Sequence, residues 1–455
     1  MRVLKFGGTS LADAGRIAGV AALVSEAAAR ERAVVVVSAL AGVTDALVEA
    51  ADAAADGEPC AARVEALERR HLRCLDALAT GGRDGGARAT IRARVAELHH
   101  LLGAAAARRR CAARDRDSVL AAGERLSVVL VALALRAAGV EAEAVDATEL
   151  VRTDSRFGEA RVDAAATEAL IRRRLGAAGD RPVPVVTGFV GADAAGRTTT
   201  LGRGGSDYSA SLVGAALGAS VVEIWTDVNG VLSGPPLLLP GARTVPELSY
   251  EEAAELAFFG AKVLHRETMR PLAALGIPIA VRNTFAAGGA ATLISRAPAT
   301  LAPGPAAVTA VEKVELLTAE PGGDRRAGSH GVHHELASAG IEPLASARAS
   351  ADATVSAAVH ADCSGRAVAT LRRGWAVATR GGLSLVAVVG HGLGRGPALG
   401  GSALTALAAE RVPLVAAWAG SSPHSFAALV ERRDLPAALA ALHGRLVART
   451  GAEAR

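Results

Sequence analysis

Residues 183–227, VPVVTGFVGADAAGRTTTLGRGGSDYSASLVGAALGASVVEIWTD, contain two apolar strands with a polar loop and a small-residue helix between them. The first strand leads through Thr187, Gly188 and Phe189, and the second ends at Asp227. A strand, a helix and a second buried strand in this order predict one unit of an α/β sheet. The polar side chains gather in the loop between these elements, where open α/β sheets place their ligands.

In the loop at 196–208, GRTTTLGRGGSDY, three glycines surround Arg203. The glycines allow φ > 0 and a close approach of backbone amides and a helix N-terminus to an anion. Arg203 is suited to gripping a carboxylate or phosphate through two parallel hydrogen bonds. Ser206 or Asp207 is expected to cap the helix. The alternative is an ordinary strand-to-helix turn with a capping side chain and a solvated arginine. The glycines are Gly202, Gly204 and Gly205.

Length and composition favour a cytoplasmic protein of two or three domains with a large aliphatic core, because 51% of the 455 residues are apolar and only 3% are aromatic. The apolar runs, such as 126–135, are shorter than the roughly 18 residues of a membrane span, and residues 1–8 enter a strand without a secretory signal. The cysteines have no metal-ligand spacing and predict reduced structural thiols. No basic block is interleaved with aromatics, so neither a nucleic acid nor a membrane is an expected partner. The cysteines are Cys60, Cys74, Cys111 and Cys363.

Lysine is rare in a chain whose basic residues are almost all arginine; it occurs only as Lys5, Lys262 and Lys313. A compact ammonium fits between phosphate oxygens where a planar guanidinium does not. Lys5 ends a short strand before Gly7-Gly8, and Lys262 follows Gly260, so both are candidate phosphate contacts. The pattern Gly-x4-Gly-Lys-Ser/Thr is absent from the sequence, which excludes an ordinary P-loop.

Further strand ends collect polar residues. A second buried strand over 33–38 leads into Ser38 and Thr44, and the strand at 221–225 leads into Thr226 and Asp227, a turn suited to a nucleotide or a metal-bound water. Between the strands, residues 46–116 predict an all-helical excursion whose His99-His100 pair lies on the surface. Glu124 is expected to open the next helix, where it either satisfies the helix dipole or binds a substrate ammonium.

Together these motifs resemble the aspartokinase family, which has an amino acid kinase fold over residues 1–296. The resemblance implies that ATP phosphorylates the β-carboxylate of L-aspartate to 4-phospho-L-aspartate, the first step towards lysine, threonine and methionine. The matched segments are 5–10, 38–44, 123–125, 198–208, 225–227, 259–265 and 283–285.

The resemblance also implies roles for single residues. Arg203 holds the aspartate α-carboxylate and Glu124 its ammonium, while Asp207 orients the loop. The lysines, backbone amides and Mg²⁺ neutralise charge during phosphoryl transfer, which needs no general base because the nucleophile is already a carboxylate. The implied catalytic residues are Lys5, Asp207 and Lys262; the implied aspartate contacts are Ser38, Thr44, Glu124, Arg203 and Ser206; the implied ATP contacts are Lys5, Gly7, Gly8, Thr9, Ser10, Thr226, Asp227, Leu232 and Lys262. No metal ligand is assigned to the protein.

One segment departs from the family. After Gly230 the family usually continues with Tyr and then Asp-Pro-Arg, whereas residues 231–237 read VLSGPPL. This change leaves two alternatives open beside an active aspartate kinase: a related amino acid kinase of a specialised pathway, and a catalytically weak regulatory subunit. No nicotinamide-binding unit follows, so no homoserine dehydrogenase activity is expected.

Past a Pro/Ala linker, residues 308–380 and 381–455 resemble paired ACT regulatory domains, which in the family bind an amino-acid effector and pair across a homodimer. Ser421 and Ser422 are the candidate effector contacts. A Gln that often binds the effector is matched by Arg348 in the first repeat and Ala419 in the second. The expectation is therefore weak feedback inhibition, with a purely structural dimerisation module as the alternative.

Overall fold

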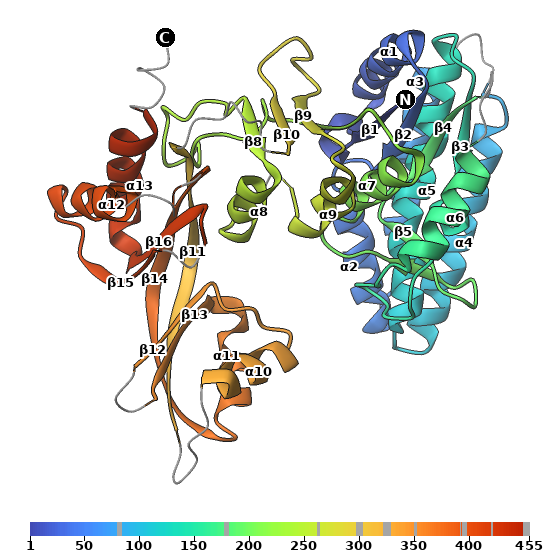
Figure 1. Cartoon of the computed structure of the whole chain (residues 1–455). Coiled ribbons are helices and arrows are strands. Elements are labelled where there is room, and N and C mark those ends of the chain that lie inside the picture. The colour runs from blue at the N-terminus through green and yellow to red at the C-terminus, as the bar shows by residue number, and fades with distance from the viewer. Residues whose placement is uncertain are drawn as a thin grey trace. The chain divides into compact units, whose positions relative to one another are not determined.

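The chain folds into two compact units that do not follow its linear order (Figure 1). The first contains Met1–Val231 and Leu264–Arg296, and the second contains Leu232–Val263 and Ala297–Arg455. The structure is a computed structural model and describes residues 1–79, 84–176, 182–261, 264–296, 304–321, 329–349, 353–391, 393, 398–419 and 422–448. Each unit is described separately below.

The first unit is built on a mostly parallel sheet in which its strands follow the order β3-β4-β2-β1-β7-β9-β10. β1 lies between β2 and β7 in parallel register, with Lys5 opposite Val36 and Ile224. Only β10 runs antiparallel to its neighbour β9. The strands are β1 (Arg2–Phe6), β2 (Ala33–Val37), β3 (Ala142–Val145), β4 (Val183–Thr187), β7 (Val221–Thr226), β9 (Ile279–Asn283) and β10 (Thr292–Ser295), with a separate hairpin of β5 (Val190–Ala192) and β6 (Thr198–Thr200).

Helices cover both faces of this sheet, which explains why β2 is an uninterrupted run of buried aliphatic residues. α1 and α5 pack on one face, and α7 packs on the other beside α6 and α9. Gly214 of α7 lets this helix approach Val222, because a Cβ at Gly214 would lie only 2.4 Å from the Val222 Cγ2. The helices are α1 (Ala14–Arg30), α2 (Val43–Ala55), α3 (Ala61–Leu78), α4 (Ala87–Ala107), α5 (Ala113–Ala137), α6 (Ala164–Leu175), α7 (Gly205–Leu217) and α9 (Arg266–Leu275).

The helical excursion is confirmed as α2, α3 and α4, and His99 and His100 are exposed on α4. The expectation that Glu124 opens a helix is wrong, because α5 begins at Ala113 and Glu124 lies in its middle. The sequence pattern hid this because 113–118 is rich in charged residues. α5 is long and apolar enough to span a membrane by length and composition, but 83% of its most apolar window is buried within the protein, as expected of a core helix.

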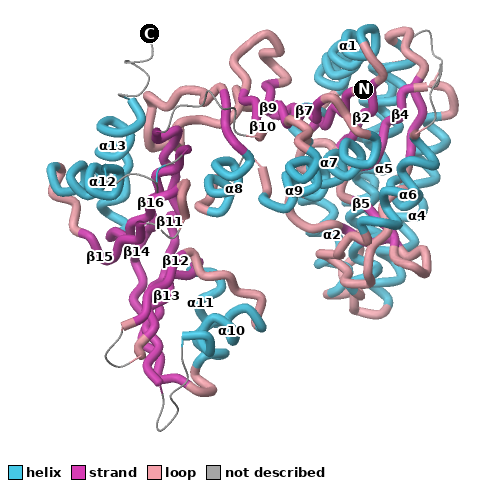
Figure 2. The backbone as a smooth tube through the Cα atoms, viewed as in Figure 1, coloured by secondary structure: helices cyan, strands magenta, loops and turns pink. Residues whose placement is uncertain are grey.

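The second unit contains a six-stranded antiparallel sheet in the order β12-β13-β11-β14-β16-β15. Its two longest strands, β11 and β14, run side by side along the sheet (Figure 2). The elements are β8 (Glu247–Ser249), α8 (Tyr250–Phe258), β11 (Gly304–Pro321), α10 (Ser329–Ser338), β12 (Ala345–Arg348), β13 (Val355–His360), α11 (Ala361–Leu371), β14 (Trp375–His391), α12 (Ala398–Ala409), β15 (Leu414–Ala419), β16 (Ser425–Glu431) and α13 (Leu435–Leu442).

Two strand–helix–strand–strand–helix repeats share these long strands. The expected boundary at 380/381 falls inside β14, whose two ends serve different repeats. The first half of β11 pairs with the second half of β14, as Val308 opposite Val388 shows. The strand that completes the second repeat is therefore the first half of β11, which precedes the rest of the first repeat in the chain.

Residues 232–261 pack with this C-terminal sheet. The Ser233 hydroxyl lies 2.9 Å from His443 Nε2, and the Thr309 hydroxyl donates to the Phe259 carbonyl at 3.2 Å. Leu239 is buried in the same core as Val308 and Leu439.

Candidate active site

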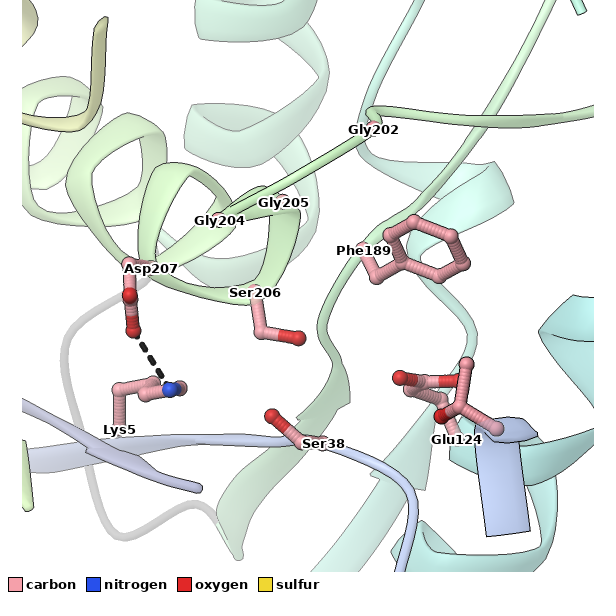
Figure 3. A pocket seen from close by; sticks show the side chains of 10 residues that line it. Lys5, Ser38, Glu124, Phe189, Gly202, Gly204, Gly205, Ser206 and Asp207 are labelled. Carbon is pink, nitrogen blue, oxygen red and sulfur yellow. Dashed lines mark ion pairs between the residues drawn. The ribbon is translucent and has the colours of Figure 1, made fainter. Parts of the chain in front are cut away.

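A cavity of about 260 Å³ opens at the carboxyl ends of β1, β2 and β4 in the first unit. The hydroxyls of Ser38 and Ser206 lie between an ion pair on one side and Glu124 on the other (Figure 3). The cavity thus brings together six residues that the sequence predicted as site residues, from four separate segments. Its lining consists of Lys5, Ser38, Thr44, Glu124, Phe189, Gly202, Gly204, Gly205, Ser206 and Asp207.

The ion pair joins Lys5 of β1 to Asp207 in the first turn of α7, with 2.5 Å between Nζ and Oδ1. Both side chains are mostly buried, with 11% and 15% of their surface exposed. Lys5 faces α7 because alternate residues of β1 point to opposite faces of the sheet, and Leu4 and Phe6 enter the core on the α1 side. The pair fixes an ammonium beside the N-terminus of a helix.

The cap of α7 differs from the expectation. Gly204, in the left-handed conformation at φ 72°, is the N-cap, and neither Ser206 nor Asp207 caps the helix, which leaves both side chains free to face the cavity. Gly188 permits the close packing of this turn, since a Cβ there would lie 2.6 Å from Ser206 Cβ. Gly202 also has a positive φ of 73°, as expected for this loop.

Phe189 is the cavity residue that the motif analysis missed as a site residue. It adopts φ 67°, which is rare for a bulky side chain. Its N–H donates to the Ser209 hydroxyl at 3.0 Å, and its ring occupies the space where a Cβ at Gly205 would lie, 2.8 Å from Cδ2. The sequence did offer a signal. Gly188 precedes Phe189, and Gly205 begins α7, and a glycine at such positions indicates that the backbone packs closely against another segment.

Glu124 is 3% exposed, and its Oε2 has no hydrogen-bond partner among the described residues. Burial raises the pKa of the Glu124 carboxyl to about 8. Gly123 brings α5 against the loop after β2, since a Cβ at Gly123 would lie 2.7 Å from Ala39 Cβ. The Ser127 hydroxyl donates to the Ser38 carbonyl at 2.7 Å. A buried carboxyl with one oxygen left unpaired in a polar cavity is poised to take a cationic group of a ligand.

Arg203 is exposed and is not among the residues that line the cavity. It lies in a tight turn between Gly202 and Gly204, both of which have positive φ angles. Among the described residues the Arg203 guanidinium has no carboxylate partner. Its two chain neighbours line the cavity, so a ligand anion there could be reached from this turn.

The glycine turn after β1 lies beside Lys5. A Cβ at Gly7 would be 3.7 Å from Lys5 Nζ, and one at Gly8 would be 2.9 Å from the Ala39 carbonyl oxygen. Thr9 is exposed, whereas Ser10 is fully buried with its hydroxyl 2.7 Å from Thr284 Oγ1. The close spacing leaves backbone, rather than side chains, to face a ligand here.

The remaining predicted nucleotide contacts are dispersed. Thr226 ends β7, and its hydroxyl donates to Asp227 Oδ1 at 3.2 Å. Asp227 is exposed at the carboxyl end of this strand. Leu232 belongs to the second unit and bridges Thr244 there. Lys262 lies outside the described residues.

Of the predicted effector contacts, Ser421 lies outside the described residues, and the Ser422 hydroxyl accepts the His424 N–H at 3.1 Å. Arg348 ends β12 and Ala419 ends β15, and both are exposed. Neither position offers an amide side chain.

Comparison with known proteins agrees with this fold. A model of the "Amino acid kinase family" matches residues 1–283. The chain is 30% identical to a bifunctional aspartokinase/homoserine dehydrogenase of Haemophilus influenzae over 98% of its own length and 56% of that protein. It is 37% identical to lysine-sensitive aspartokinase 3 of Escherichia coli over 64% of its length and 63% of that protein.

Among solved structures, the chain is similar to E. coli aspartokinase III in complex with aspartate and ADP, in the R-state, with a TM-score of 0.85 and 30% identity over 98% of this chain and 99% of that one. The lysine- and aspartate-bound T-state of the same enzyme gives a TM-score of 0.78. The chain therefore belongs to the amino acid kinase family and, within it, to the aspartokinases. Its fold class is confirmed: an amino acid kinase fold followed by ACT-type repeats. The chain spans 56% and 63% of the lengths of the two curated relatives quoted.

Proposed function

We propose that this chain is an aspartate kinase that transfers the γ-phosphoryl group of ATP to the β-carboxylate of L-aspartate and forms 4-phospho-L-aspartate. The observation that carries the proposal is the cavity in which the Lys5–Asp207 ion pair and the buried carboxyl of Glu124, with its unpaired Oε2, stand at opposite sides. One side suits an amino acid's ammonium, and the other suits a phosphoryl group in transfer.

On the aspartate side, Glu124 pairs with the substrate ammonium and thereby becomes charged at neutral pH, because a nearby cation lowers the pKa that burial has raised. Arg203 at the rim takes the α-carboxylate through two hydrogen bonds. Ser38, Thr44 and Ser206 then direct the β-carboxylate towards Lys5. The E. coli relative was solved with aspartate and ADP, which supports this assignment.

On the nucleotide side, the residues fit a polyphosphate. Gly7 puts no side chain beside Lys5, and Gly8 has no room for one against the Ala39 carbonyl, so backbone groups and an ammonium face the phosphates. Thr9, Ser10, Thr226, Asp227, Leu232 and Lys262 complete the proposed ATP contacts.

Mg²⁺ is proposed to arrive with ATP. No group of three acidic, His or Cys side chains suited to a metal occurs among the described residues, and phosphate oxygens are its usual ligands at such sites. When bound, it would neutralise phosphate charge, while Asp207 keeps Lys5 in place.

We further propose that residues 1–296 form the catalytic domain, that 308–380 and 381–455 form the two ACT domains, that Ser421 and Ser422 belong to any effector site, and that the protein is a cytoplasmic homodimer paired through the ACT repeats. The comparisons do not favour a different amino acid kinase or a silent subunit.

Arg203→Ala tests the substrate assignment. Loss of a bidentate contact to a charged group costs roughly 1.5–3 kcal/mol, so we expect the KM for aspartate to rise about tenfold or more while the KM for ATP stays unchanged. Arg197→Ala is a matched control, because this nearby arginine pairs with Asp193 outside the cavity. A change confined to the KM for ATP would make the aspartate assignment wrong.

A further inference from the structure

Two loops that carry proposed site residues touch each other directly. The Ala41 N–H donates to the Gly8 carbonyl at 3.1 Å, which joins the loop after β2 to the glycine turn after β1. The contact is tight, because a Cβ at Gly8 would lie only 2.9 Å from the Ala39 carbonyl oxygen. The first loop begins at Ser38 and leads into the first turn of α2, which contains Thr44; the second contains Gly7. The position of the proposed aspartate-binding loop relative to the proposed phosphate-binding turn therefore depends on this hydrogen-bonded contact.

A side chain from the helical excursion holds both loops from outside. Arg70 of α3 donates from Nη1 to the Ala41 carbonyl at 2.8 Å and from Nη2 to the Ala12 carbonyl at 3.0 Å. Ala12 directly follows the turn at Gly8–Leu11. One planar guanidinium thus spans the two loops and completes a ring of hydrogen bonds with the Ala41–Gly8 contact.

Arg70 is set for this task by its surroundings. It is half-buried, and among the described residues its guanidinium forms no ion pair with a carboxylate, so both donor arms serve backbone carbonyls. α3 is a rigid base because Val64, Leu67 and Leu75 are buried in the main core. Lysine cannot reproduce the contact, since a single ammonium lacks the rigid fork that reaches two carbonyls at once.

We infer that Arg70 is a positioning residue for phosphoryl transfer: it fixes the acceptor loop, with Ser38 and Thr44, against the phosphate loop, with Gly7 and Gly8. This inference rests on the proposed function for its kinetic consequence and on geometry alone for its structural one. Because a misplacement of about 1 Å between reacting groups typically costs about a hundredfold in rate, loss of the clamp acts on kcat more than on substrate binding.

The test compares Arg70→Met and Arg70→Lys in the full-length protein with Arg69→Met. Arg69 is the neighbouring arginine on α3, 65% exposed, and its ion pair with Glu65 lies within its own helix. We expect kcat to fall about tenfold to a hundredfold in Arg70→Met, with both KM values changed by less than about threefold, and to fall less in Arg70→Lys, which keeps one hydrogen bond. Arg69→Met should match the wild type.

Hydrogen–deuterium exchange supplies a readout that does not depend on activity. Peptides covering 7–13 and 39–45 should exchange faster in Arg70→Met, while β2 and α5 keep wild-type protection. Unchanged exchange in both peptides would show that Arg70 does not hold the two loops together. A kcat equal to that of Arg69→Met would show that Arg70 has no role in phosphoryl transfer. Should the wild-type protein show no kinase activity, the proposed function fails by itself, and the exchange result still decides whether Arg70 holds the loops.

Discussion

At the scale of single residues, Glu124 is the least expected feature. It is a carboxyl group in the middle of a buried helix, and burial raises its pKa to about 8 from an ordinary value of 4.5. The Glu124 carboxyl is therefore a neutral acid over much of the physiological range. A ligand ammonium converts it to a paired carboxylate, so binding and ionisation are linked.

Glu124→Gln predicts a specific change in pH dependence. Because the folded pKa is raised, the wild-type side chain contributes stability that is complete below the unfolded pKa of 4.5 and is lost as pH rises through about 8. The neutral Gln does not titrate, so the Tm of the variant relative to the wild type should rise as pH increases from about 4.5 to about 8 and then level off. The KM for aspartate should rise in the variant and lose its pH dependence.

Thermal melts across this pH range, together with aspartate titrations, measure both effects. Glu149→Gln provides a control, because this carboxyl is 60% exposed and outside the cavity. If the Tm difference between the Glu124 variant and the wild type stayed constant with pH, the carboxyl would not be the buried neutral acid described above.

At the scale of elements, the strand-to-helix turn at 201–207 places three site features at once. The left-handed Gly204 caps α7, Ser206 and Asp207 line the cavity, and the exposed Arg203 lies between Gly202 and Gly204, which also line it. Ser233 plays a comparable role in the second unit. It accepts the Arg243 N–H at 3.0 Å, lies 2.9 Å from His443 Nε2, and its own carbonyl accepts the Val308 N–H at 2.9 Å.

Ser233→Ala should therefore destabilise the second unit by about 1–3 kcal/mol, because it leaves buried polar partners unsatisfied. Burial lowers the pKa of the His443 imidazole below 6.5, so this group contributes stability above pH 6.5 that is lost as pH falls through the lowered pKa. Hydrogen exchange of α13 and β11 measures the loss. Thr405→Ala is the control, since this exposed hydroxyl bonds only to Gly401 within α12. Equal protection in the two variants would refute the role given to Ser233.

Much of this site was predictable from the sequence because its residues follow strand ends. Lys5, Ser38 and Thr44 come after apolar runs, and the carboxyl ends of parallel strands meet at one edge of a sheet. Phe189 was not predicted because phenylalanine rarely adopts a positive φ, so its residue type gives no sign of the turn that places it in the cavity. The cap of α7 was also misassigned, because the glycine conformation and not the following hydroxyl begins the helix.

At the scale of the whole molecule, chain order and spatial order differ. The strand that completes the second C-terminal repeat is the first half of β11, and 232–261 packs in the same unit. Linear sequence patterns identified both repeats but did not predict this exchange, since it depends on the pairing of residues about 80 positions apart, as between Val308 and Val388.

The repeats predict feeble feedback. An amide ligand both donates to and accepts from an amino-acid effector, whereas Ala419 does neither and the exposed Arg348 only donates. Unpaired effector groups cost about 1–3 kcal/mol each, which weakens binding roughly ten- to a hundredfold. Threonine and lysine, separately and together, should leave activity nearly unchanged. Dose-response curves test this, and sub-millimolar inhibition by either would show that other residues form an effector site.

The most direct test of the central claim is hydroxamate trapping of an acyl phosphate made by the purified protein from ATP, Mg²⁺ and L-aspartate. The account predicts product with the wild type and with Lys313→Ala, whose exposed lysine lies in β11. It predicts a loss of about a hundredfold or more in kcat with Lys5→Ala, while the Tm shows that the variant is folded. Absence of aspartate-dependent product from the folded wild-type protein, or an unchanged kcat in Lys5→Ala, would contradict it.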